Sequence, residues 1–89
     1  MTEEKLSIIA KAMSDKTRVC IIKKIAEKEI CACKLLESLE CCQSTLSHHM
    51  KVLTTSGLII SKEVGKWTHY SFNNILFDEY LSSLTKFKK

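Results

Sequence analysis

The sequence predicts one mainly α-helical domain with a small β-hairpin near its end. The chain has 89 residues, which is the length of a single compact domain. It contains no proline and only two glycines, Gly57 and Gly65, so few residues favour a break in a helix. Two runs rich in β-branched and aromatic residues, 58–64 and 66–72, are separated around Gly65 and predict the hairpin. We therefore expect a single domain over residues 1–89 with the element order α-α-α-α-β-β-α.

The first two helices are predicted from the spacing of their apolar residues. In the segment 2–13 these residues recur at i, i+3, i+4 and i+7, which places them on one face of a helix. They are Leu6, Ile9, Ala10 and Met13. Ser14 and Asp15 are of the types that cap helices, and the segment 18–28 then carries a second apolar stripe. That stripe contains Val19, Ile22, Ile25 and Ala26.

The next two helices are joined by a very short connection. Segment 30–39 ends in an amphipathic patch of leucines, and a longer periodic segment over 43–56 follows after only three residues. Such a pair over residues 30–56 is typical of a helix-turn-helix. The longer helix has an apolar face and an opposite polar face.

A hairpin and one more helix complete the chain. Gly57 is expected to end the fourth helix in the left-handed conformation, and residues 58–72 then form the hairpin. The segment 74–87 has an apolar face of its own. This face contains Phe77, Tyr80, Leu81 and Leu84. A helix-turn-helix followed by a hairpin predicts a winged helix-turn-helix domain, with the hairpin as its wing.

The polar face of the fourth helix has the composition of a surface that reads double-stranded DNA. A major groove about 12 Å wide admits one helix, whose outer side chains contact base edges. The candidate contacts are Gln43, Ser44, Thr45, Ser47, His48 and Lys51, with Lys62 and Lys66 of the hairpin on the phosphates. Most polar stripes are simply solvated, but here a short turn precedes the stripe and a basic hairpin follows it. Over residues 43–72 three lysines oppose one glutamate, which leaves a net charge of +2.

Other side chains near this surface are expected to have different roles. His49 lies next to the apolar stripe, and we expect it to be packed. Trp67, Tyr70 and Phe72 are also expected to pack, because strand alternation buries one face of a hairpin. His69 is a weaker candidate for a phosphate contact.

A homodimer is expected, because one domain of this size contacts too few base pairs to be selective. The terminal helices, 2–13 and 74–87, carry more apolar surface than so short a domain buries alone. The dimer face is therefore predicted to contain Leu6, Ile9, Met13, Phe77, Leu81 and Leu84.

Composition and motifs exclude other classes of protein. No apolar run approaches the roughly 18 residues of a membrane span, and the first residues are no secretory signal, so we expect a cytoplasmic protein without membrane contact. There is no acid–base pair with a nucleophile and no glycine-rich phosphate loop, so we expect neither an enzyme nor a bound cofactor. The formal net charge of +4 permits a polyanionic partner. A module for contacts other than DNA is an alternative.

The five cysteines point to metal or redox chemistry. Their number is odd and the cytosol keeps thiols reduced, which disfavours a disulfide framework. Thiolates select soft ions, so Cys31 and Cys33 are candidate ligands. Residues i and i+2 of a helix lie about 200° apart, so this pair would close on one ion only if the first turn unwound. The alternative is that both behave as small buried hydrophobic residues.

The sequence resembles the ArsR/SmtB family of bacterial and archaeal metal-responsive repressors. Four segments carry the resemblance, which extends over roughly residues 11–72. They are DKTRVCII at 15–22, ICACKLL at 30–36, CQSTLSHHMKVLTTSGLI at 42–59 and GKWTHYSF at 65–72. The resemblance implies a repressor that binds operator DNA and is released by an ion. It further implies that Cys31 and Cys33 are the inducer site for As(III) or Sb(III), with Cd, Pb or Zn as alternative ions.

The third ligand of this site is left open by the sequence. Arsenic repressors often carry a third cysteine where this chain has Leu36. Cys41 would lie about 15 Å from Cys31 along a continued helix, and core packing is its expected role. A partner subunit, water or a small thiol are the alternatives.

Cys42 carries a competing hypothesis. It stands at the expected start of the fourth helix, where a helix N-terminus lowers the pKa of a thiol and raises its reactivity. A thiol-redox response through Cys42 is therefore an alternative to metal induction. Cys20 has no expected role.

Overall fold

The computed structural model describes residues 1–88 and contains five helices and one small antiparallel sheet within them. The helices are α1 (Glu3–Ala12), α2 (Lys16–Glu27), α3 (Ala32–Glu37), α4 (Gln43–Ser56) and α5 (Asn74–Thr85). The strands are β1 (Ile30–Cys31), β2 (Ile59–Val64) and β3 (Trp67–Phe72), in the order β1-β3-β2. The mainly helical fold with a hairpin wing is confirmed, and a third strand is added to it.

Side-chain caps explain where three of the helices begin. The Thr2 hydroxyl accepts a hydrogen bond from the Lys5 amide, and the Asp15 carboxylate accepts one from the Arg18 amide. The Asn73 side chain does the same for α5. Each cap satisfies a backbone N–H that has no partner within its own helix.

The core lies where α1, α2 and α4 meet the start of β2. Its buried apolar residues include Ile9, Ala12, Ile21, Ile22, Ile25, Leu35, Leu46, Met50, Leu53, Leu58, Ile59 and Tyr80. The stripe predicted for the second helix was wrong in part, since Val19 and Ala26 are exposed. The helix begins at Lys16 and turns Ile21, Ile22 and Ile25 inward, which buries larger side chains.

Strand β1 was not predicted, and it changes the start of the helix-turn-helix. Ile30 pairs with Tyr70 and Cys31 with His69, so β1 covers the free edge of β3. The third helix therefore begins at Ala32 and not at Ile30. A strand of two residues is too short to show a sequence periodicity. Its pairing partner also lies about forty residues further along the chain, so no local pattern indicates the pairing.

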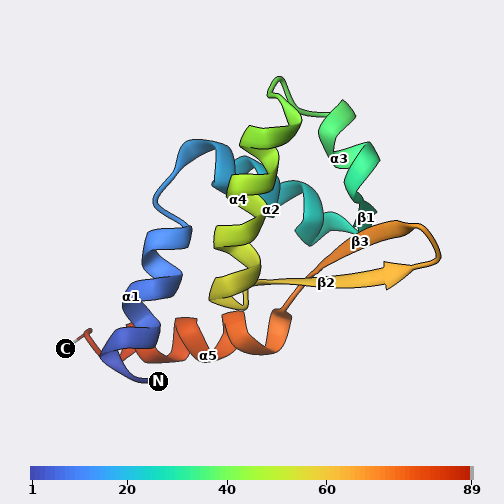
Figure 1. Ribbon diagram of the computed structural model, residues 1–89. Coiled ribbons are helices and arrows are strands. Elements are labelled where there is room, and N and C mark those ends of the chain that lie inside the picture. Colours follow the sequence, from blue (N-terminus) through green and yellow to red (C-terminus); the bar gives the residue numbers. More distant parts are fainter. Residues whose placement is uncertain (89) are drawn as a thin grey trace.

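The elements separate into two ends of the molecule. Figure 1 shows α3 and the N-terminal half of α4 at one end, with the hairpin projecting sideways beyond the helices. At the other end α5 lies across the first part of α1, and the two termini are close together. No helix in the described part of the chain is both long and apolar enough to cross a membrane.

Gly57 supports the junction between α4 and the wing, and its replacement is expected to destabilise the fold. Its φ is 88°, and an added Cβ would lie 3.0 Å from Cδ2 of Leu76. We expect Gly57→Ala to lower the free energy of unfolding by about 1–3 kcal/mol, from left-handed strain and this close contact. Urea denaturation of the two proteins measures the difference.

Gly65 provides the matched control for this prediction. Its φ is 63°, but a Cβ there would meet nothing within 4 Å. Gly65→Ala should therefore cost less than Gly57→Ala, and equal costs would show that the Leu76 contact is irrelevant.

Candidate functional site

The outer face of α4 is the first part of the site. The helix spans the predicted residues, and its apolar side, including Leu46, Met50 and Leu53, is buried. All six candidate DNA contacts on α4 are exposed. They are Gln43, Ser44, Thr45, Ser47, His48 and Lys51. This exposure satisfies the geometric requirement for a helix that enters a groove.

His49 joins the buried side of α4 to the junction of α1 and α2. It is 9 % exposed, so the expected packing is confirmed. Its Nδ1 lies 3.1 Å from Nη1 of Arg18, and because a guanidinium only donates, Nδ1 is the acceptor. The same guanidinium donates to the carbonyl groups of Ala12 and Lys11, at 2.8 and 3.3 Å. Sequence reasoning missed this contact, which holds α4 in position.

The wing presents its lysines as predicted but not all of its aromatic side chains. Lys62 and Lys66 are exposed, while Tyr70 and Phe72 are half-buried against the core. The packing role expected for Trp67 was wrong, because its side chain is 57 % exposed. Trp67 begins β3 beside the hairpin turn, beyond the reach of the core.

His69 faces an acidic side chain. Its Nδ1 lies 3.4 Å from a carboxylate oxygen of Glu29. A carboxylate at this distance competes with a phosphate for the same imidazole nitrogen, so His69 is a poor candidate for a backbone contact.

The second part of the site is the pair of thiols at Cys31 and Cys33, whose sulfur atoms are 3.0 Å apart. The expectation that the helix must unwind to bring them together was wrong. Cys31 is the residue before α3 and has extended backbone, with φ −79° and ψ 154°. Because Cys31 lies outside the helix, the 200° separation of i and i+2 does not apply to the pair.

The two thiols also influence each other electrostatically. The hydrogen bond from Cys33 lowers the pKa of Cys31, and the same bond raises the pKa of Cys33. Cys31 is half-buried and Cys33 is exposed, so the pair is open to a solute. The alternative of two buried hydrophobic residues does not fit this exposure.

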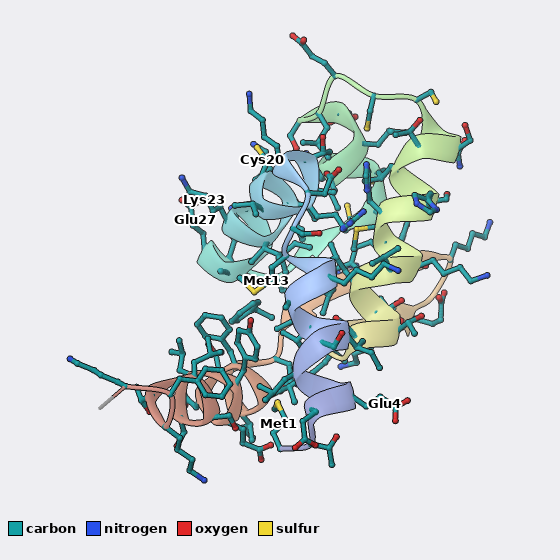
Figure 2. The ribbon with its side chains drawn as sticks, turned by 90° about the vertical axis from the view of Figure 1, so that its left-hand side faces the viewer. Met1, Glu4, Met13, Cys20, Lys23 and Glu27 are labelled. Atoms are coloured by element: carbon teal, nitrogen blue, oxygen red, sulfur yellow. The ribbon has the colours of Figure 1, made fainter. Side chains whose placement is uncertain are left out.

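No third ligand joins the pair within residues 1–88, where no group of three or more His, Cys, Asp or Glu side chains is placed to hold a metal ion. Since α3 ends at Glu37, no continued helix separates Cys31 from Cys41. Cys41 packs against the core and, with Cys20, lines a separate pocket. Cys20 points outward from α2 on the side that carries Lys23 and Glu27 (Figure 2).

Cys42 precedes α4 and is an activated thiol. Its sulfur lies 3.1 Å from the hydroxyl groups of both Ser44 and Thr45. These hydrogen bonds stabilise the thiolate and lower the pKa of Cys42 to about 6. The side chain is exposed, so the thiolate is accessible at neutral pH.

We expect the alkylation of Cys42 to report this pKa. Its rate with iodoacetamide should be half-maximal near pH 6 and level above that, because the thiolate is the nucleophile. Mass spectrometry of the peptide that contains Cys42 measures the rate between pH 5 and 9. Replacing Ser44 and Thr45 by alanine should move the midpoint toward about 8.5, the value of a free thiol. An unchanged midpoint would contradict the role of the hydroxyl groups.

The predicted dimer face is only partly available. Ile9 is completely buried in the core of its own chain, so its assignment to the dimer face was wrong. The helix turns Ile9 toward α4 and leaves Ile8 40 % exposed instead. The other predicted residues are half-buried or exposed. They are Leu6, Met13, Phe77, Leu81 and Leu84.

Together the exposed polar helix, the short turn before it and the basic hairpin define a winged helix-turn-helix DNA-binding protein. The comparisons with known proteins agree with this class. Residues 15–61 match the family model described as bacterial regulatory protein, arsR family. The chain belongs to this family of transcriptional regulators, and it is a repressor and not an enzyme.

Individual relatives and structures support the same assignment. An arsenical resistance operon repressor of Staphylococcus aureus is 37% identical over 84 residues, covering 94% of this chain and 81% of its own. A homolog of a cadmium resistance transcriptional regulatory protein, also from Staphylococcus aureus, is 33% identical, covering 88% and 62%. The solved structure of an ArsR-like transcriptional regulator from Rhodococcus superposes with a TM-score of 0.87 at 23% identity, covering 94% and 79%, which supports the fold.

Proposed function

We propose that this repressor leaves its operator when As(III) or Sb(III) bonds to Cys31 and Cys33. The observation that carries the proposal is the 3.0 Å separation of the two sulfur atoms, in an accessible position at the start of α3. Two neighbouring thiolates favour soft ions over hard ones. The relative named for arsenical resistance supports arsenic first, and the one named for cadmium resistance keeps Cd, Pb and Zn as alternatives.

The position of the pair provides a route to the DNA surface. Cys31 belongs to β1, which pairs with β3 of the wing, while Cys33 belongs to α3 of the helix-turn-helix. An ion bonded to both sulfurs would fix β1 against α3 and change how the wing lies relative to α4. The conformation with the ion would then differ from the one that fits the operator.

DNA contact is proposed through the eight exposed residues of α4 and the wing. Ser47, His48 and their neighbours in the N-terminal half of α4 face the base edges, and Lys62 and Lys66 contact phosphates. The lysines add affinity that falls with salt but little sequence preference.

A homodimer is proposed through α1 and α5. This end of the molecule exposes apolar side chains beyond those predicted, including Ile75 of α5 at 78 % and Phe87, which follows α5, at 70 %. Large apolar side chains at this exposure, at the end of the molecule away from α3, support contact with a second copy.

A mobility-shift titration on the protein's own promoter tests the whole proposal. We expect binding that weakens as salt is raised, and release by As(III) or Sb(III) at lower concentration than by Cd(II), Pb(II) or Zn(II). Release by Cd(II) alone would assign the site to the alternative ions. Absence of binding, or binding without salt dependence, would favour a module for other partners.

A thiol-redox response is the second candidate function, favoured by the low pKa and exposure of Cys42. A peroxide would transfer one oxygen and its proton to the thiolate, giving a sulfenic acid and releasing hydroxide from hydrogen peroxide or an alkoxide from an alkyl hydroperoxide. The product would lie at the N-terminus of the helix that contacts DNA. If peroxide releases the unmodified protein from DNA but not the Cys42→Ser protein, the redox response is supported. If arsenite still releases the Cys42→Ser protein, induction through Cys31 and Cys33 is independent of Cys42.

A further inference from the structure

A polar groove of about 360 Å³ lies between α4 and the wing. Helix α4 contributes Ser47 and Lys51 to its wall, and the wing contributes Ser61, Glu63 and Thr68. Ser47 and Lys51 are two of the proposed DNA contacts. The groove therefore lies within the proposed DNA surface, at the place where its two elements meet.

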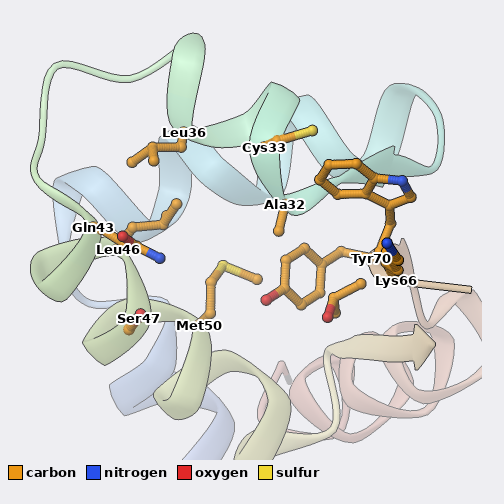
Figure 3. A pocket seen from close by; sticks show the side chains of 11 residues that line it. Ala32, Cys33, Leu36, Gln43, Leu46, Ser47, Met50, Lys66 and Tyr70 are labelled. Atoms are coloured by element: carbon orange, nitrogen blue, oxygen red, sulfur yellow. The ribbon is translucent and has the colours of Figure 1, made fainter. Parts of the chain in front are cut away.

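The groove is continuous with a second cavity of about 300 Å³, which lies beside Cys33 of α3. Met50 and Tyr70 belong to the walls of both, and Figure 3 shows them facing each other across this second cavity. The wall of the second cavity is mainly apolar. In the polar groove, by contrast, every side chain apart from Met50 carries a hydroxyl group or a charge.

Glu63 places a negative charge in this groove. It is the only acidic residue in the segment 43–72, which contains three lysines. Its carboxylate accepts a hydrogen bond of 2.9 Å from the hydroxyl group of Thr68, its partner across the hairpin. Lys62 belongs to the opposite face of the hairpin, because successive residues of a strand alternate. Within residues 1–88 no basic side chain forms an ion pair with Glu63.

The charge of Glu63 acts on its surroundings in the groove. Burial and, to a smaller extent, the negative charge of Glu63 raise the pKa of Tyr70, another residue of the wall. Lys51 contributes one positive charge to the same wall. The two charges cancel in the groove, whereas the segment 43–72 as a whole carries a net charge of +2.

A duplex that accommodates α4 has to place part of its backbone against this groove. A helix in the major groove lies between two phosphate backbones, because that groove is only about 12 Å wide. The wing lies beside α4 and projects beyond the helices (Figure 1), so it lies outside the major groove when α4 is inside it. One phosphate backbone therefore passes between α4 and the wing.

We infer that a DNA phosphate lies in the polar groove and that Glu63 opposes it, so that Glu63 limits the affinity of the repressor for DNA. The inference rests on the proposed function, because it uses α4 and the wing as the DNA surface. Lys51 and Ser61 provide an ammonium and a hydroxyl group for the phosphate, whereas the carboxylate repels it. Every duplex has phosphates, so the repulsion lowers the affinity for operator and for unrelated DNA alike.

Glu63→Gln tests the inference, because the amide keeps the shape of the side chain and the acceptor for Thr68 but removes the charge. We expect this variant to bind operator and unrelated duplex about fivefold more tightly at low salt. The gain should shrink as salt is raised, so the slope of log affinity against log salt should be steeper by about one. Fluorescence anisotropy on labelled duplexes over a range of salt concentrations measures both quantities.

Two controls separate the charge in the groove from other effects. Glu63→Asp keeps the charge, and its affinity should stay within about twofold of that of the unmodified protein. Glu27→Gln makes the same change in net charge at an exposed position of α2, on the opposite side of the molecule from α4 (Figure 2), and should also stay within about twofold. A gain in either control equal to that in Glu63→Gln would contradict the inference.

Operator duplexes with one neutral methylphosphonate each locate the contact. At the phosphate in the groove, the loss of affinity should be several-fold larger for Glu63→Gln than for the unmodified protein, because only the unmodified protein also loses a repulsion. At the other phosphates the two proteins should lose affinity equally.

The outcomes separate the two proposals. An unchanged affinity in Glu63→Gln, or the same methylphosphonate profile for both proteins, would overturn the inference while DNA binding through α4 and the wing stands. Absence of salt-dependent operator binding in the unmodified protein would instead overturn the proposed DNA surface itself.

Discussion

A repressor with Cys31→Ser and Cys33→Ser is expected to bind its operator normally and to keep it when arsenite is added. In the unmodified protein, arsenite should weaken operator binding by about 5-fold to 150-fold, the range of typical allosteric couplings. The variant loses both sulfur ligands, so this factor should fall to about one. Its fold should persist, because serine at position 31 is a preferred residue before a helix. Mobility-shift titrations with and without arsenite measure both affinities.

The matched control removes two other sulfur atoms. Cys20 and Cys41 line a separate pocket, so a Cys20→Ser, Cys41→Ser protein should respond to arsenite like the unmodified one. Full release of DNA from the Cys31 and Cys33 variant would show that the inducer binds elsewhere.

A carboxylate in the N-terminal half of α4 is expected to weaken operator binding strongly. Ser47 is exposed on the polar face, so Ser47→Glu leaves the core unchanged. It removes one hydrogen-bonding group from the groove and places a negative charge between two rows of phosphates. Loss of about 2–3 kcal/mol corresponds to an operator affinity that is about 30-fold to 150-fold lower. Fluorescence anisotropy on a labelled operator at fixed salt measures the change.

The control for this prediction lies on the same helix. Thr55 is exposed near the C-terminal end of α4, away from the proposed base contacts. Thr55→Glu adds the same charge and should weaken binding several-fold less. Equal losses in the two variants would mean that net charge, and not the position on α4, determines affinity.

The long elements of the fold could be predicted from sequence because their patterns are local. Helix α4 was placed correctly from its period and from Gly57, whose positive φ was also expected. The second helix was found, and Ile22 and Ile25 of its predicted stripe are buried, but Val19 and Ala26 are exposed and Ile21 is buried in their place. Local spacing determines that a helix forms but only loosely which way it faces.

The thiol site shows what local spacing misses. A contact from Cys31 to Cys33 contradicts helix geometry only if residue 31 is helical, and its pairing with His69 in β3 prevents that. The hydrogen bond from Arg18 to His49 and the cavity beside Cys33 likewise depend on residues distant in sequence. The identity of the candidate residues was therefore predictable, whereas their geometry depended on tertiary contacts.

Helix α4 is held by side-chain hydrogen bonds from α1 and from α2. Arg18 of α2 donates to the imidazole of His49 in the middle of α4. The ammonium group of Lys5 in α1 donates to the carbonyl of Ser56 at the end of α4, at 2.8 Å. These two hydrogen bonds limit how far α4 can shift or rotate relative to α1 and α2. If α1 forms part of the contact between two copies, the distance between the two α4 helices of the dimer is fixed by this contact. An ion bound near the wing would then act by changing the orientation of the wing relative to α4, and not by changing that spacing.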